Sequence, residues 1–225
     1  MSENSADPRQ EKKRPTLLFL RRFLKHGRRV ASIAPSSRAM ARAACEHVDP
    51  RSPQIIVELG AGTGAITEVA CRRMHPRSRL IAVEIDPIFA QVLASRCPRA
   101  EVLNCDVRDL ESHLERLGID KIDLLLNGLP TPSLPREVNQ IVLECFAKYA
   151  NGAYFSQLTV MPWIYKPMYR RIFEQVTFSL VPANLPPGGV YHCRGLRSDF
   201  LGRIPGKNGK PGPNGRHCEN GNGHA

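Results

Sequence analysis

The residues from Ile55 to Gly64 constrain the fold more than any other part of the chain. They read IIVELGAGTG, an apolar run that ends in an acid and then turns on alternating glycines. A short apolar run bounded by glycine is typical of a buried parallel strand. Glycine allows a positive φ and lets a ligand approach the backbone, because no Cβ intervenes. The segment therefore predicts a strand, a nucleotide-type cofactor turn and a helix that begins near Ala65.

The glycine turn alone does not identify the ligand. Gly60, Gly62 and Ala65 also fit the G-x-G-x-x-G/A pattern of dinucleotide-binding domains, so NAD is one alternative and a domain without cofactor is another. Glu84 follows a second apolar run, within Val83-Glu84-Ile85-Asp86. A carboxylate at the carboxyl end of such a strand can accept hydrogen bonds from both hydroxyls of a ribose.

Two further strand ends complete the pattern. A third candidate strand, residues 100–104, ends at Cys105-Asp106-Val107, where Asp106 can accept a hydrogen bond from an adenine amino group. A fourth, residues 122–126, leads directly into Asn127-Gly128-Leu129-Pro130. We expect these four strand ends to face one crevice.

In this order the motifs resemble those of class I S-adenosylmethionine-dependent methyltransferases, over residues 53 to about 160. The resemblance implies an α/β, Rossmann-like, doubly wound and mostly parallel seven-stranded sheet with helices on both faces. It implies S-adenosylmethionine as cofactor. The implied cofactor residues are Glu58, Gly60, Gly62 and Gly64 at the methionine end, Glu84 with Ile85 at the ribose, Asp106 with Val107 at the adenine, and Asn127.

Composition agrees with one such domain. The chain has 225 residues, of which 42% are apolar, which suffices for one sizeable core with short terminal extensions. Its seven cysteines include no C-x-x-C pair, which favours reduced thiols over disulfides or a metal site. Residues 1–14 are polar, and no run reaches the ~18 apolar residues of a membrane span. We expect a cytosolic protein without a bound metal.

The positive charge is concentrated near the N-terminus. Eleven Lys or Arg lie between Pro8 and Arg42 against one acid, Glu11, so this segment carries +10 of the formal +11. Residues 17–29 have helical amphipathic periodicity. The predicted membrane-binding residues are the apolar Leu17, Phe19, Leu20, Phe23 and Leu24 on one face and the basic Arg21, Arg22, Lys25, Arg28 and Arg29 on the opposite face.

Such a basic amphipathic helix can lie in a bilayer interface with its cations near anionic headgroups. It can instead dock on its own domain with solvated cations, or bind phosphates of a nucleic acid. Aromatic side chains are not interleaved with its cations, which disfavours single-stranded RNA, and a nucleic-acid partner is not expected. A second helix, with Ser36 or Ser37 as its N-cap, is expected to close over the cofactor.

The chain also resembles a narrower family, the bacterial phospholipid N-methyltransferases that convert phosphatidylethanolamine to phosphatidylcholine. The resemblance covers residues 17–197. It rests on the basic helix running into residues 32–37, the loop at 128–135 and the segment 184–187 before a last strand. It implies a phospholipid substrate, an anionic membrane surface as partner and a location on the cytosolic face of the membrane.

Candidate catalytic residues follow from the chemistry of methyl transfer to an amine. The reaction creates positive charge on nitrogen, which carbonyl oxygens, aromatic faces or a weak base can stabilise. Asn127 and the Leu129 carbonyl follow the fourth strand, and Pro130 leaves the preceding carbonyls free to face a ligand. Tyr191 and His192, on the last strand, can offer a ring face and a proton acceptor, although each can equally be a packing residue.

These expectations divide the chain into a disordered segment (1–15), membrane-associating and lid helices (16–52), a methyltransferase domain (53–201) and a disordered tail (202–225). The expected function is methylation of phosphatidylethanolamine at the membrane surface. The alternatives are an rRNA adenine N6-dimethyltransferase, a soluble small-molecule methyltransferase and a non-catalytic membrane adaptor. Thr131 stands where the RNA enzymes place an aromatic residue, and residues 195–225 leave no room for their RNA-binding domain. The sequence does not define the oligomeric state.

Overall fold

The computed structural model describes residues 35–131, 134–150, 152–160, 162–184 and 187–197. The expected membrane-binding helix (17–29) and the segments expected to be disordered (1–15 and 202–225) lie outside these residues. In chain order the elements are α3 (Pro35–Ala44), β1 (Ile55–Leu59), α4 (Ala65–Arg73), β2 (Arg79–Val83), α5 (Pro87–Arg96), β3 (Glu101–Leu103), the 3₁₀ helix η1 (Val107–Asp109), α6 (Leu110–Arg116), β4 (Leu124–Asn127), α7 (Arg136–Tyr149), β5 (Tyr154–Thr159), α8 (Pro162–Ile172), β6 (Phe173–Val181) and β7 (Gly188–Leu196).

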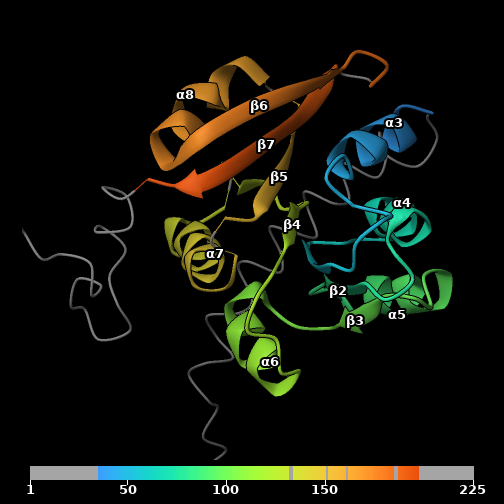
Figure 1. The fold of residues 1–225 in the computed structure, drawn as a ribbon. Helices are drawn as coiled ribbons and strands as arrows, with labels where there is room; N and C mark the ends of the chain where they lie inside the picture. The colour runs from blue at the N-terminus through green and yellow to red at the C-terminus, as the bar shows by residue number, and fades with distance from the viewer. Residues whose placement is uncertain (1–34, 132–133, 151, 161, 185–186, 198–225) are drawn as a thin grey trace, which may run out of the picture.

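One seven-stranded sheet organises the molecule, with the order β3-β2-β1-β4-β5-β7-β6 (Figure 1). The first five strands of the chain pair with one another in parallel. β7 is antiparallel to both β5 and β6, so the two last strands form an antiparallel edge. The expected doubly wound, mostly parallel, seven-stranded architecture is confirmed.

Helices cover both faces of this sheet (Figure 1). On one face, α3, α4 and α5 pack against the even-numbered side chains of β1, such as Ile56, and against Leu124 and Leu126 of β4. On the other face, α6, α7 and α8 pack against Val57 and Leu125. Successive side chains of a strand point to opposite faces of the sheet, and these strands are apolar at nearly every position. Two apolar cores therefore form, one on each face of the sheet.

The strand order reverses between β1 and β4, and ligands of open α/β sheets bind outside the strand ends at such a switch point. The backbone segments that follow β1 and β4 approach each other closely there. A Cβ on Gly128 would lie 2.9 Å from the carbonyl oxygen of Gly60 and 3.1 Å from that of Leu59. Only glycine therefore fits at position 128. The four expected strand ends do meet at one edge of the sheet.

Some boundaries differ from those expected. β3 is only three residues long, and β4 begins two residues late and includes Asn127. α3 begins at Pro35, so Ser36 and Ser37 lie inside its first turn instead of capping it. Proline is favoured at the first helical position, where its missing N–H costs nothing. Within the described residues, no helix is both long and apolar enough to cross a membrane.

Candidate functional site

The glycine turn after β1 has the backbone conformation that its sequence predicts. Gly60, Gly62 and Gly64 have φ values of 69°, 58° and 91°. The N–H groups of Gly60 and Ala61 both donate to the carbonyl oxygen of Val83, at 2.9 and 3.1 Å, which fixes the turn against the end of β2. The turn then passes directly into α4 at Ala65.

The three glycines have different surroundings. A Cβ on Gly60 would lie 2.6 Å from Cδ2 of Leu129, and one on Gly64 would lie 2.7 Å from Cδ1 of Leu93 on α5. These two glycines therefore permit close packing of the loop after β4 and of α5. A Cβ on Gly62 would meet no atom within 4 Å. The surface of Gly62 is thus the part of the turn that is open to a ligand.

Glu58, the acid before the turn, is fully buried beneath α4. The hydroxyl of Thr67 donates to its Oε2 at 2.6 Å, whereas Oε1 is buried without a hydrogen-bond partner. Burial raises the pKa of this carboxyl to about 8, and the nearby Glu84 carboxylate acts in the same direction. A buried acceptor without a partner is costly, so it marks a place where a bound donor would be stabilised.

Glu84 connects the end of β2 to the glycine turn. Its Oε2 accepts a hydrogen bond from the backbone N–H of Gly62 at 2.7 Å, and its Oε1 accepts one from Asp86 at 2.8 Å. Burial is the largest influence on its pKa and raises it. Each carboxylate oxygen keeps further acceptor capacity, so Glu84 can hold the turn and still accept bonds from ligand hydroxyls.

Asp106 lies at the end of β3, where it caps η1 by accepting a hydrogen bond from the N–H of Arg108 at 3.0 Å. The Arg108 guanidinium also donates to both of its oxygens, from Nε at 3.0 Å and from Nη2 at 2.6 Å. This paired carboxylate keeps acceptor capacity toward the neighbouring cavity.

A cavity of about 360 Å³, part of it open to solvent, lies between these strand ends. Its lining is Gly60, Val83, Ile85, Cys105, Asp106, Val107, Leu129, Leu134 and Val138. Its apolar walls with one acid suit an adenine ring. Four of the predicted cofactor residues, Gly60, Ile85, Asp106 and Val107, line it.

Asn127 forms a hydrogen-bonded network with neighbours on β5 and in the following loop. Its side-chain amide donates to Oε1 of Gln157 at 2.6 Å and to the hydroxyl of Thr131 at 2.8 Å. Its Oδ1 accepts a hydrogen bond from the N–H of Leu129 at 3.2 Å. Asn127 is fully buried, so it holds the shape of the loop in this structure.

The Leu129 carbonyl was expected to face a ligand, and this expectation requires correction. Its oxygen accepts hydrogen bonds from Nε2 of Gln157 at 3.0 Å and from the N–H of Thr131 at 2.8 Å. A carbonyl oxygen has two lone pairs, and these two donors occupy both. Pro130 does remove a donor, but Gln157 on the adjacent strand supplies another one.

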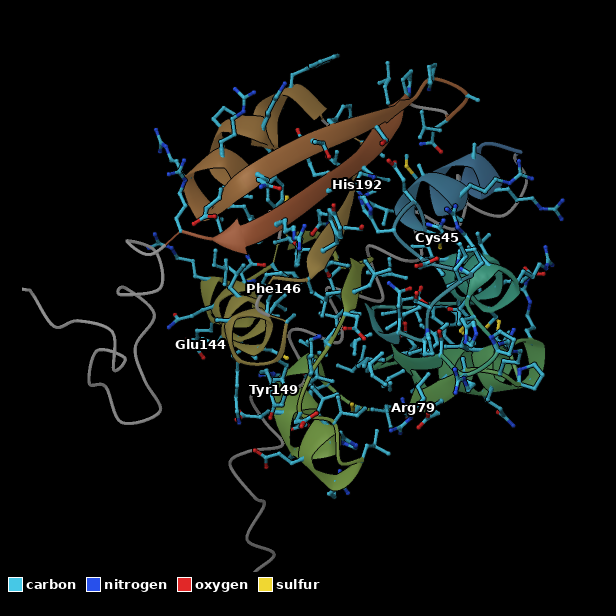
Figure 2. The ribbon with its side chains drawn as sticks, viewed as in Figure 1. Cys45, Arg79, Glu144, Phe146, Tyr149 and His192 are labelled. Carbon is cyan, nitrogen blue, oxygen red and sulfur yellow. The ribbon has the colours of Figure 1, made fainter. Side chains whose placement is uncertain are left out.

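Tyr191 and His192 do not lie together at the cavity, which corrects a second expectation. As neighbours on β7 they point to opposite faces of the sheet. Tyr191 belongs to the core on the cavity side, but its ring is covered by Tyr169 and Phe178, each with a centroid distance of 4.9 Å. His192 lies on the α3 side, where Figure 2 labels it near Cys45. It is therefore not placed to accept a proton at the cavity.

The structure adds residues that the sequence did not identify. Gln157, Thr131, Arg108 and Thr67 each hold a predicted site residue by a side-chain hydrogen bond. The sequence does contain a hint of the role of Gln157, because the polar pair Ser156-Gln157 interrupts an otherwise mostly apolar strand near its carboxyl end. Partners on other elements are not visible in a local pattern.

Comparisons with known proteins agree with this geometry. The FtsJ-like methyltransferase family model matches residues 41–148. A relative from Singulisphaera acidiphila, named ornithine lipid N-methyltransferase, is 44% identical over 187 residues, which are 81% of this chain and 97% of the relative.

Solved structures share the fold. The Burkholderia thailandensis 1,6-didemethyltoxoflavin-N1-methyltransferase, bound to its substrate and S-adenosylhomocysteine, has a TM-score of 0.59 at 17% identity, covering 88% of this chain and 94% of that one. The O-methyltransferase TomG from Streptomyces achromogenes, in complex with S-adenosylmethionine, has a TM-score of 0.55 at 18% identity, covering 74% and 82%.

The sheet order, the glycine turn and the two strand-end acids, together with these matches, define a class I S-adenosylmethionine-dependent methyltransferase. The buried Oε1 of Glu58, the open surface at Gly62 and the cavity beside Asp106 fit that cofactor. Within this class the chain belongs to one family with the Singulisphaera acidiphila relative, and its residues 41–148 are similar to the FtsJ-like methyltransferases.

Proposed function

We propose that this protein transfers methyl groups from S-adenosylmethionine to the amino group of a membrane lipid headgroup, at the membrane surface. The observation that carries the proposal is the 44% identity to a relative named as a lipid N-methyltransferase, over 97% of that relative's length. The match covers nearly the whole relative, so it includes the region that accepts the methyl group as well as the cofactor turn.

Two amine lipids are candidate substrates. The name of the relative specifies an ornithine lipid, whereas the resemblance noted in the sequence implies phosphatidylethanolamine. Both lipids present an amino group on a polar head. The 44% identity to the relative favours ornithine lipid as the first candidate substrate, with phosphatidylethanolamine as the second.

In this proposal each site residue has a separate role in binding the cofactor or in positioning the reacting groups. S-adenosylmethionine, when bound, supplies a methyl group activated by a sulfonium. Glu58 would accept hydrogen bonds from its ammonium, Glu84 from its ribose hydroxyls and Asp106 from its adenine amino group. The apolar walls formed by Val83, Leu129, Leu134 and Val138 exclude water. Gln157 and Asn127 hold the loop after β4 in place, and orientation of this kind can supply ~7–11 kcal/mol of a displacement barrier.

Exposed apolar side chains at one edge of the sheet support the membrane part of the proposal. Val160, Trp163 and Ile164 follow the carboxyl end of β5, and Leu180 lies near the end of β6. Gly189 pairs with both Thr159 and Leu180, so these strand ends are at the same edge of the sheet. Aromatic and aliphatic side chains in such a position suit the interface of a bilayer. In this proposal the basic residues between 17 and 29 add attraction to anionic lipids.

The proposal can be tested with the full chain, radiolabelled S-adenosylmethionine and three kinds of anionic vesicle. One contains ornithine lipid, one phosphatidylethanolamine and one neither amine lipid. Label in the ornithine-lipid product, identified by thin-layer chromatography, is the expected result. Label only in phosphatidylethanolamine would select the second substrate. No lipid product from either amine vesicle, while S-adenosylhomocysteine binds normally, would refute the lipid proposal and leave the methyltransferase class intact.

A further inference from the structure

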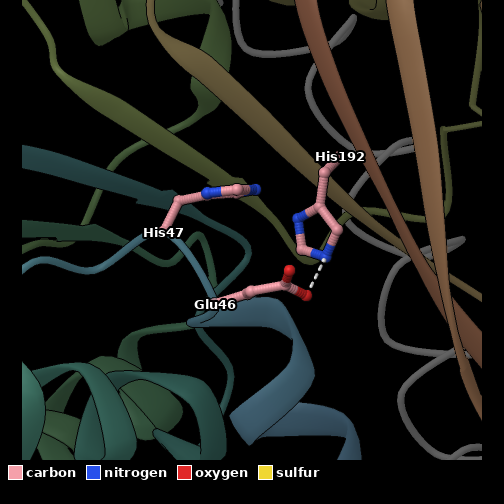
Figure 3. Close-up of side chains that lie close together, drawn as sticks. All are labelled: Glu46, His47 and His192. Atoms are coloured by element: carbon pink, nitrogen blue, oxygen red, sulfur yellow. Dashed lines mark ion pairs between the residues drawn. The ribbon is translucent and has the colours of Figure 1, made fainter.

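Three side chains with metal-binding chemistry meet on the face of the sheet opposite the cofactor cavity. Glu46 and His47 follow the end of α3, and His192 extends from β7 (Figure 3). One ligand atom from each residue lies within 4.8 Å of the other two. The proposed methyl transfer uses none of these residues.

The cluster contains two imidazole nitrogens without hydrogen-bond partners. Nε2 of His192 is buried, and the residue is only 2% exposed. It lies 3.2 Å from Oε2 of Glu46, within ion-pair distance but without the alignment of a hydrogen bond. Nε2 of His47 is also buried without a partner. Two such nitrogens beside a carboxylate are a costly arrangement unless a cation joins them.

The neighbours of His192 orient it for such a role. Its Nδ1 lies 3.0 Å from the hydroxyl of Ser156 on β5, which is fully buried. With Nδ1 donating to that hydroxyl, Nε2 carries the lone pair toward Glu46 and His47. Metal-binding histidines are typically held in this way, with the second ring nitrogen bonded to a protein group. Ser156 thus supplies the supporting contact in advance.

Burial lowers the pKa of His192 to about 4, and burial lowers the pKa of His47 from its ordinary value. The pKa of the Glu46 carboxyl is lowered, first by the hydrogen bond from Ser179.

We infer that Glu46, His47 and His192 form a binding site for a divalent zinc-like metal ion. Two imidazoles and a carboxylate form a known ligand set for Zn²⁺, with the fourth position left to water. Ligand atoms around tetrahedral zinc lie ~3.3 Å apart, so the 3.2 Å pair of His192 and Glu46 already has bound spacing, and His47 completes a set whose ligand atoms all lie within 4.8 Å of one another.

Charge and ligand type argue against Mg²⁺ or Ca²⁺. Those ions prefer several oxygen ligands, and the cluster offers one carboxylate. The positive charges of Arg73 and Arg194 also act on His47 and lower its pKa further. The same positive charges would repel a metal cation. Charge attraction alone is therefore too weak to bind the ion, and coordination by the imidazoles has to provide the affinity.

A metal at this place would tie the end of α3 to β7. The polar contact between them is weak, since Glu46 is half exposed and its ion pair with His192 is poorly aligned. Coordination would fix the connection between α3 and β1 against the antiparallel edge of the sheet. The ion would stabilise this arrangement and would not contact the methyl donor.

The inference is tested by titrating the chelator-treated full chain with Zn²⁺ alone, by calorimetry, and with Co²⁺ by visible absorption. One equivalent of tight binding, a four-coordinate Co²⁺ spectrum and a higher melting temperature are expected. His47→Gln and Glu46→Gln, both at partly exposed positions, should each weaken this binding by ~100-fold or more while S-adenosylhomocysteine affinity is unchanged. His192→Gln is the third variant, but its burial puts folding at risk.

His113→Gln on α6 is the matched control, because it removes a partly exposed histidine elsewhere on the surface. His26, His217 and His224 remain in every variant and provide a common background. Loss of binding in His47→Gln and Glu46→Gln but not in His113→Gln supports the site. Equal Zn²⁺ affinity and stoichiometry in all these proteins, or no binding by the parent chain, would overturn it.

Discussion

The side-chain amide of Asn127 donates to Oε1 of Gln157 at 2.6 Å, joining the ends of two parallel strands beside the cavity. The amide nitrogen of Gln157 in turn donates to the Leu129 carbonyl. One buried glutamine therefore holds both the last residue of β4 and the loop that follows it. The position of this loop determines one wall of the cavity, through Leu129 and Leu134.

Replacement of this glutamine should affect stability and catalysis together. Gln157→Leu removes one hydrogen-bond partner from the buried amide of Asn127 and one from the carbonyl of Leu129, so that Thr131 alone still bonds to each of them. We expect the free energy of unfolding to fall by about 1–3 kcal/mol. Methyl transfer should slow by about 10-fold or more, because the loop is no longer positioned. Denaturant unfolding and initial rates measure the two effects.

Gln140→Leu is the control for that change. Gln140 lies on α7, is only partly buried and bonds to Glu144 of the same helix at 3.0 Å. Its replacement should change the free energy of unfolding by no more than about 0.5 kcal/mol. If the two leucine variants were equally stable and equally active, Gln157 would have no positioning role.

Gly62 and Gly118 form a matched pair for testing the cofactor turn. Their φ values are 58° and 65°, and a Cβ on either would meet no atom within 4 Å. Alanine at each position should therefore cost a similar ~1–2 kcal/mol of backbone strain. Only Gly62→Ala should weaken S-adenosylhomocysteine binding, by about 10-fold or more, because its methyl group would enter the ligand's space. Similar affinity loss in both variants, measured by calorimetry, would contradict this role.

Much of this site follows from local sequence patterns. The strand before the glycine turn, the helix at Ala65 and the acids at 84 and 106 are local features, because apolar runs, positive-φ glycines and strand ends are set by near neighbours. The structure places all of them at one edge of the sheet. The doubly wound fold is predictable for the same reason.

The face on which a side chain lies is not a local property. Tyr191 and His192 are adjacent, and a shift of one residue in strand register exchanges their faces. The pairing of Gln157 with Asn127 depends on which strand neighbours β4, a consequence of topology. Arg108 and Thr67 are likewise ordinary surface-type residues until the tertiary fold places them against Asp106 and Glu58.

The buried Glu58 predicts a pH dependence of stability with a definite sign. Its pKa in the folded protein is about 8, above the ordinary value of 4.5, so the folded state holds a proton that the unfolded state releases. Stability from this group is present below about pH 4.5 and is lost as the pH rises through about 8. Glu58→Gln should remove up to about 5 kcal/mol of that decline.

Urea unfolding of the parent chain and Glu58→Gln at pH 5 and pH 9 measures the difference directly, since the other titrating groups are common to both. The same variant should bind S-adenosylhomocysteine more weakly at pH 8, because its neutral amide cannot pair with the ligand's ammonium. Parallel stability profiles for the two proteins would show that Glu58 is already ionised in the folded state.

Exposed apolar side chains near the end of β5 should contribute to membrane binding. Ile164 on α8 and Ile88 on α5 are both 64% exposed, so equal solvent contact makes them a matched pair on opposite faces of the sheet. Ile164→Ser should reduce sedimentation with anionic vesicles, and Trp163→Ser should reduce it further, since aromatic rings bind strongly at the bilayer interface. Ile88→Ser should sediment as the parent chain does, and all three variants should bind S-adenosylhomocysteine normally. Equal loss in Ile88→Ser and Ile164→Ser would mean that apolar exposure in general, and not this edge of α8, governs binding to the bilayer.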